Sequence, residues 1–131
     1  MARTAVCYSD EMLAHDTGEF HPESPARLTA VLDHLKENGL YSLPLAPESA
    51  LVEDILRVHT REHVDTVRRC CLEGEEYPDP DTVMMDRTWD VSLLAAGAGI
   101  TACKSVLEKG CDNAFVLMRP PGHHAEADFS M

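Results

Sequence analysis

The stretch that decides the fold is NAFVLMRPPGHHA, residues 113–125. Its first part, Asn113 to Met118, is short, continuous and apolar, as strands within a parallel sheet tend to be. The remainder of the chain, Arg119 to Met131, is expected to form a loop at the carboxyl end of that strand, where open α/β sheets bind ligands. Two prolines stiffen the loop, and Gly122 permits backbone angles that other residues avoid. The stretch therefore predicts a rigid loop that holds two adjacent histidines in place.

Upstream of this strand, candidate strands and helices alternate along the chain. Thr4 to Tyr8 is a second apolar strand, and Leu43 to Leu45 is a short third one, whose proline favours a sheet edge. Helical patterns follow Pro25, a candidate N-cap at Ser49, a second N-cap at Thr60, and the segment beginning near Thr88. This alternation predicts an α/β fold: a partial parallel sheet of about three strands with helices on both faces, in a single domain over residues 1–131.

Several positions in these helices carry specific expectations. Gly39 and Gly74 are expected to end the first and third helices. Leu72 is expected to face inward from the third helix. The fourth helix, from about Thr88 to Lys109, carries a run of small residues, Ala95 to Gly99. Another segment of the chain could approach the helix closely along this run.

The composition argues against several functional classes. The chain has 131 residues, 11 basic and 23 acidic, and a formal net charge of −12, so no basic patch could displace counterions from a nucleic acid. No apolar run approaches the ~20 residues of a membrane helix, and the N-terminal apolar run is too short for a secretory signal. The five cysteines are odd in number and form no C-x-x-C motif, which favours a reduced protein of the cytoplasm.

The adjacent histidines His123 and His124 are the strongest candidates for chemistry. Imidazole titrates near neutrality, so a positioned pair can provide a general base and a general acid. A bare His-His pair is most often a feature of the solvated surface. The preceding strand, the two prolines and the glycine shift the balance toward a functional pair.

Four segments resemble one known family. Arg119 to Ala125 resembles the tandem-histidine signature of zinc-dependent histone deacetylases and acetylpolyamine amidohydrolases, in the form of the class II-like bacterial branch. His21 to Leu28 and Val58 to Val64 resemble two further segments of that family, and Leu93 to Gly99 resembles its small-residue helix. The matches span nearly the whole chain in family order. The resemblance implies the N-terminal part of the arginase/deacetylase fold.

The resemblance also implies catalytic roles. In that family, zinc polarises an acetamide carbonyl and activates water, while the tandem histidines move protons. By position, His124 would be the main general base and acid, and His123 its electrostatic partner. The implied substrates are acetylated lysine or acetylated polyamines.

The substrate-binding residues implied by the resemblance lie in three segments. Gly122 belongs to the tandem-histidine loop, and Arg27 matches an arginine behind the family's pocket, near an internal acetate channel. Asp79 and Asp81 both match the rim region that holds an acidic residue against the substrate backbone. The match does not decide between the two aspartates.

The family's zinc ligands and transition-state tyrosine lie downstream of the tandem histidines, whereas this chain ends at Met131. We therefore expect this chain to correspond to the N-terminal third of a deacetylase. We also expect that this chain alone binds no zinc and catalyses little or no hydrolysis. An exposed sheet edge beside Asn113 to Met118 predicts self-association or pairing with a complementing chain. The alternative is a non-catalytic, self-associating binding module derived from the same fold.

Two other histidine groups offer competing metal hypotheses. His59 to His63 fits the H-x-x-E-H pattern of inverted zinc peptidases, but an N-cap at Thr60 would place His59 outside the helix. His15, Asp16 and His21 share one loop and have the right ligand types. A polar loop without metal explains this second group more simply.

Overall fold

The computed structural model describes all 131 residues, and its element order confirms the predicted alternation of strands and helices. Three strands form one parallel sheet in the order β2-β1-β3: β1 (Thr4–Cys7), β2 (Pro44–Leu45) and β3 (Asn113–Val116). Register is set along β1, where Thr4 pairs with Asn113 and Val6 pairs with both Phe115 and Pro44. Because β1 is central, the predicted open edge beside β3 is confirmed.

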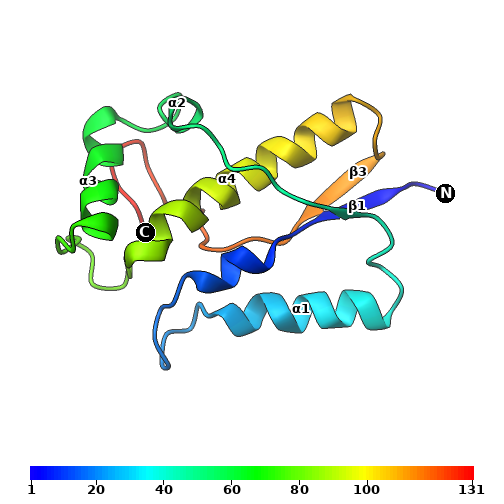
Figure 1. Ribbon diagram of the computed structural model, residues 1–131, viewed down its shortest axis with the longest axis horizontal. Helices are drawn as coiled ribbons and strands as arrows, with labels where there is room; N and C mark the ends of the chain where they lie inside the picture. Colours follow the sequence, from blue (N-terminus) through cyan, green and yellow to red (C-terminus); the bar gives the residue numbers. More distant parts are fainter.

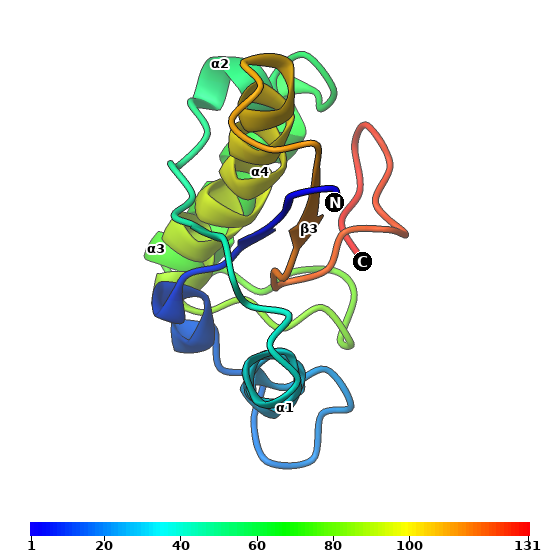
Figure 2. The same cartoon turned by 90° about the vertical axis from the view of Figure 1, so that its right-hand side faces the viewer.

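The helices lie on both sides of this sheet. They are the 3₁₀ helix η1 (Asp10–Ala14) and the α-helices α1 (Pro25–Glu37), α2 (Val52–Ile55), α3 (Arg61–Leu72) and α4 (Asp86–Leu107). Figure 1 shows α4 and α1 on opposite sides of β1 and β3, as predicted. Figure 2 shows the loop after β3, in orange and red, on the β3 side of the sheet.

Local signals set several helix ends. The Thr60 hydroxyl accepts a hydrogen bond from the His63 backbone N–H at 3.2 Å, so Thr60 is the N-cap of α3, as predicted. Gly39 and Gly74 follow α1 and α3 with φ of +68° and +73°, the left-handed conformation that glycine adopts at helix ends. Leu72 is half exposed, contrary to expectation, because it lies in the last turn of α3.

The start of α2 differs from the sequence prediction. The helix begins at Val52 rather than just after Ser49. The Ala50 N–H donates to the Leu93 carbonyl of α4 at 2.9 Å, which holds residues 48–50 against that helix. A Cβ on Gly97 would lie 1.8 Å from the Glu48 carbonyl oxygen, so this crossing requires glycine. The predicted close approach to the small-residue run is therefore confirmed.

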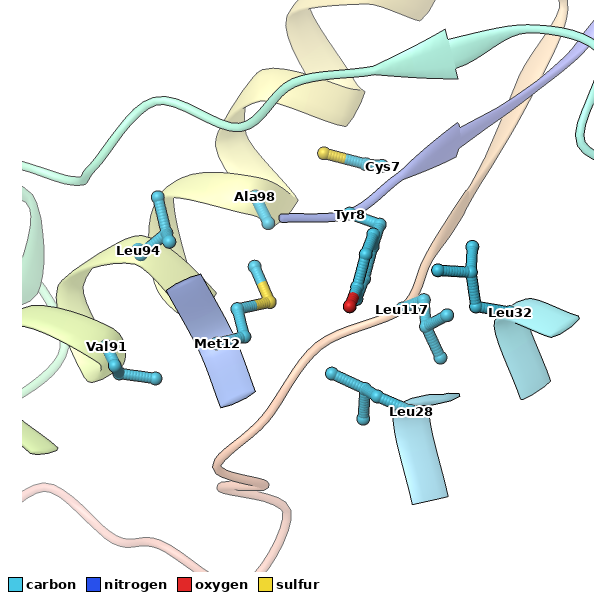
Figure 3. Packing of buried hydrophobic residues seen from close by; sticks show 9 residues of the cluster. All are labelled: Cys7, Tyr8, Met12, Leu28, Leu32, Val91, Leu94, Ala98 and Leu117. Carbon is cyan, nitrogen blue, oxygen red and sulfur yellow. The ribbon is translucent and has the colours of Figure 1, made fainter. Parts of the chain in front are cut away.

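The core joins both helical layers to the strands. Nine buried side chains form it, contributed by β1 and its continuation, η1, α1, α4 and the end of β3 (Figure 3): Cys7, Tyr8, Met12, Leu28, Leu32, Val91, Leu94, Ala98 and Leu117. By length and composition alone α4 could cross a membrane. Here its Val91, Leu94 and Ala98 pack into this core.

Candidate active-site loop

The tandem-histidine loop begins at a buried arginine. After β3 the chain stays beside β1, where the Leu117 N–H donates to the Cys7 carbonyl at 3.0 Å. Arg119 then turns its side chain inward, and none of it is exposed. Its Nε and Nη2 donate to the two carboxylate oxygens of Glu23 at 3.1 and 2.9 Å, and its Nη1 donates to the carbonyls of Met12 and His15.

The two histidines that follow are exposed. The ring centroids of His123 and His124 lie 4.1 Å apart, with the ring planes tilted by 49°. Within the loop, the Ala125 N–H donates to the Gly122 carbonyl at 3.0 Å and closes a turn around the pair. No carboxylate of this chain lies in a salt bridge or hydrogen bond with either ring. Neither ring is therefore oriented by an acidic side chain of this chain.

A pocket of about 170 Å³ lies against this loop. One wall is formed by Pro120, Pro121 and Gly122. The other walls come from the loop before α1, the loop between α3 and α4, and the start of α4, among them His15, His21, Glu23, Asp81 and Thr88. His123 and His124 do not line the pocket, so the structure brings Gly122 and Asp81 together there and leaves the imidazoles outside.

The other predicted binding residues lie around this pocket. Asp79 accepts hydrogen bonds from the Thr82 hydroxyl and from the Asp81 N–H at 3.2 Å, so its carboxylate is used to hold the turn. Arg27 is partly exposed and donates to Glu23 at 3.3 Å and to the Met118 carbonyl at 2.8 Å. Of the two rim aspartates, only Asp81 reaches the pocket.

Buried polar groups behind the pocket have shifted pKa values. Burial raises the pKa of Glu23, but the hydrogen bonds and charges of Arg119 and Arg27 outweigh it and leave the pKa below its usual range. Burial, and then the Arg119 charge, lowers the pKa of His15. His15 Nδ1 lies 2.8 Å from the Thr88 hydroxyl. Since the His15 carbonyl accepts from Arg119, this contact connects the start of the tandem-histidine loop to α4.

The second histidine group brings two rings together without completing a metal site. His59 and His63 have ring centroids 5.4 Å apart, although Thr60 caps the helix between them. His63 Nε2 bonds to the Ser130 hydroxyl at 2.8 Å, while His59 Nδ1 is buried without a partner. Burial and His59 lower the pKa of His63. No third ligand supports the peptidase hypothesis.

The structure does not bring His15, Asp16 and His21 together as a set of metal ligands. The His21 ring bonds to the carbonyls of Glu23 and Asp81, both at 3.1 Å, and His15 bonds to Thr88. Across the chain, no three His, Cys, Asp or Glu side chains come close enough to hold a metal ion. The residues present do not fit a complete zinc site.

Sequence reasoning missed Glu23 and Thr88 as parts of this site. Glu23 lies within the family-like segment His21 to Leu28, and its partner Arg119 lies 96 residues away. A glutamate between two prolines and an arginine at a strand end were visible signals. Pairing them needed the fold, because nothing in the local sequence connects them.

Comparisons with known proteins agree with this architecture. The family model of the histone deacetylase domain matches residues 21–131. A probable deacetylase of Archaeoglobus fulgidus is 39% identical over 127 residues, which cover 94% of this chain and 35% of that protein. The human polyamine deacetylase HDAC10 is 36% identical over 135 residues, which cover 94% of this chain and 20% of that protein.

A solved structure shows the same arrangement of elements. The crystal structure of the HDA15 HD domain superposes with a TM-score of 0.90 and 32% sequence identity, covering 99% of this chain and 38% of that domain's chain. The protein thus spans about a third of the length of its archaeal relative and of that solved chain. Since the family model covers most of the chain, the protein described here belongs to the histone deacetylase domain family.

Proposed function

We propose that this chain supplies the proton-transfer part of a deacetylase site that hydrolyses acetyl-lysine or acetylpolyamine amides. The observation that carries the proposal is the position of His123 and His124. They follow a parallel strand at its carboxyl end, on a loop anchored by a buried arginine and bordering a pocket. The remaining parts of the site come from segments that correspond to the other two-thirds of the relatives' length.

The two imidazoles divide the proton-transfer work. His124 is the main general base and acid, and His123 is its electrostatic partner. Their ring centroids lie 4.1 Å apart, so the two rings can act on the same bound molecule. Such a pair can accept one proton and release another within the same turnover.

Substrate binding is assigned to residues around the pocket. Gly122 and Asp81 line it, and Asp81 supplies the acidic rim group that would hold a substrate amide. Arg27 lies behind the loop, beside Glu23 and the Met118 carbonyl. The net charge of −12 suits substrates whose amines are cationic.

The isolated chain is proposed to be inert or nearly so. It gathers no set of three metal-binding side chains, and neither imidazole is oriented by a carboxylate. Both deficits would be corrected by a complementing chain. The five free cysteines support placement of the protein in the reducing cytoplasm.

A complementation assay tests this proposal. The 131-residue chain is mixed, with zinc present, with the portion of the Archaeoglobus fulgidus relative that this chain does not match, and hydrolysis of an acetyl-lysine peptide is measured. We expect turnover in the mixture and almost none from either part. His124→Ala should lower the rate by about 10²–10⁴-fold, the usual contribution of a general acid-base group.

The control for that assay is His34→Ala, which removes an exposed histidine from α1. It should leave turnover unchanged. A mixture that forms a stable complex but hydrolyses no acetyl-lysine or acetylpolyamine amide would overturn the proposed function.

The open edge of β3 favours a second candidate function. Phe115 lies on this edge strand with 46% of its surface exposed. Such an edge can pair with another strand, so a non-catalytic, self-associating module is the alternative. Restored turnover on complementation distinguishes the first function from this one.

A further inference from the structure

One side chain connects three separate segments behind the tandem-histidine loop. Arg119 is fully buried, and its guanidinium reaches the carbonyls at the end of η1 and the Glu23 carboxylate before α1. It also begins the loop that carries His123 and His124. A buried guanidinium with several partners is constrained in both position and orientation.

We propose that Glu23 and Arg119 are positioning residues that fix the tandem histidines in place. The inference rests on the proposed function, because it concerns the residues that act there as proton carriers. Neither Glu23 nor Arg119 exchanges protons with a substrate in this proposal. They act through the loop, by holding its first residue against η1 and α1.

The loop has few other attachments. Between Pro120 and Ala125, its single internal backbone hydrogen bond is the one from Ala125 to Gly122. Its next anchor is the Ala127 carbonyl, which accepts from the Thr60 N–H at 2.8 Å. The two histidines therefore lie between one anchor at Arg119 and one at Ala127, and the first is the closer to the strand.

The geometry requires arginine at position 119. Its Nε, Nη1 and Nη2 all donate, two of them to the two oxygens of one carboxylate. A lysine keeps the charge but has one ammonium group, which cannot reach both Glu23 and the η1 carbonyls. Arg27 cannot substitute, since it meets the same carboxylate from the solvent side and is 42% exposed.

The experiment uses the intact 131-residue chain and NMR of its imidazole groups. The signal is the cross-relaxation peak between the His123 and His124 rings, which reports their proximity directly. Arg119→Lys and Glu23→Gln are compared with the unchanged chain. Arg69→Lys is the matched control, because Arg69 makes an exposed ion pair with Glu75 at 3.1 Å.

We expect Arg119→Lys and Glu23→Gln to lose the ring–ring peak while amide signals of β1 and α4 keep their native positions. Arg69→Lys should retain the peak. A folded Arg119→Lys or Glu23→Gln chain that keeps the peak would overturn the proposal. So would failure of both variants to fold, since the pair would then be a folding requirement. No acetylated substrate is involved, so this outcome is independent of the complementation assay.

Discussion

Buried histidines and carboxylates make the chain's stability depend on pH. Burial lowers the pKa of His15 below the 6.5 of an exposed histidine, so the unfolded chain binds this proton more readily than the folded one. The contribution of the neutral His15 ring to the free energy of unfolding is therefore lost as pH falls through 6.5 toward the pKa of His15 in the folded chain. Glu23, whose pKa is lowered from 4.5, adds a second loss as pH falls through that lower range.

His15→Asn tests the histidine contribution. An asparagine amide can occupy the place of Nδ1 and keep the hydrogen bond to Thr88, but it does not titrate. We expect the free energy of unfolding to fall less steeply between pH 7.5 and 5.5 in this variant, with one histidine accounting for at most about 1.4 kcal/mol per pH unit. Urea denaturation across that pH range measures the slope.

The control for that measurement is His34→Asn, on the exposed side of α1. Its slope should equal that of the unchanged chain. A slope that is equally steep in His15→Asn would show that the buried ring is not the group responsible. Whichever result is found, the sequence alone could not single out His15, because its burial comes from contacts with residues more than 70 positions away.

Among the elements, α4 carries the sharpest packing constraint. Residues 48–50 cross it so closely that a Cβ on Gly97 would lie 2.5 Å from the Ala50 nitrogen as well as 1.8 Å from the Glu48 oxygen. Gly97→Ala should therefore destabilise the chain by about 1–3 kcal/mol through overpacking against backbone. Thermal unfolding, followed by circular dichroism, measures the loss.

Gly99→Ala is the matched control on the same helix. A Cβ there meets no heavy atom within 4 Å, so the change should stabilise the helix by up to about 1 kcal/mol. Opposite signs at positions 97 and 99 are the expected result. Equal effects at both glycines would mean that helix propensity, and not the crossing segment, decides their role.

Helix ends were predictable where the signal was local. Thr60 caps α3 and Gly39 follows α1 because each meets a backbone requirement of its own helix terminus. Ser49 is not a cap because the segment around it is held against α4, where the Glu48 N–H donates to Thr101 and the Ala50 N–H donates to Leu93. These contacts are tertiary, and helix propensity does not predict them.

For the molecule as a whole, the open edge of β3 predicts association between chains. Phe115→Lys should shift the protein toward monomer, because lysine opposes strand pairing and removes an exposed ring. The substitution makes the net charge less negative, so greater overall repulsion cannot explain the dissociation. Sedimentation velocity over a wide concentration range measures the distribution.

Phe20→Lys provides the matched comparison, since Phe20 is 93% exposed in the loop before α1 and away from the sheet edge. It should leave association unchanged. An unmodified chain that sediments as a compact monomer at every concentration would contradict the expected pairing.

The sequence predicted the sheet, the tandem histidines and the loop that carries them, because these depend on short apolar runs and on one motif. The pocket and the Glu23–Arg119 pair could not be predicted, since each is assembled from segments that are distant in the sequence. The same limit applies to Asp79 and Asp81. The two aspartates are distinguished only by the pocket, which Asp81 lines and Asp79 does not.

The central claim is that this chain supplies the proton-transfer part of a deacetylase site but not a complete zinc site. Its most direct test is the zinc content of the purified 131-residue chain, after exchange into metal-free buffer and reloading with zinc. Because no three ligands converge, we expect no retained zinc. Stoichiometric zinc that is lost when His123 and His124 are both replaced by alanine would contradict the claim. The tandem histidines would then be metal ligands in this chain rather than proton carriers.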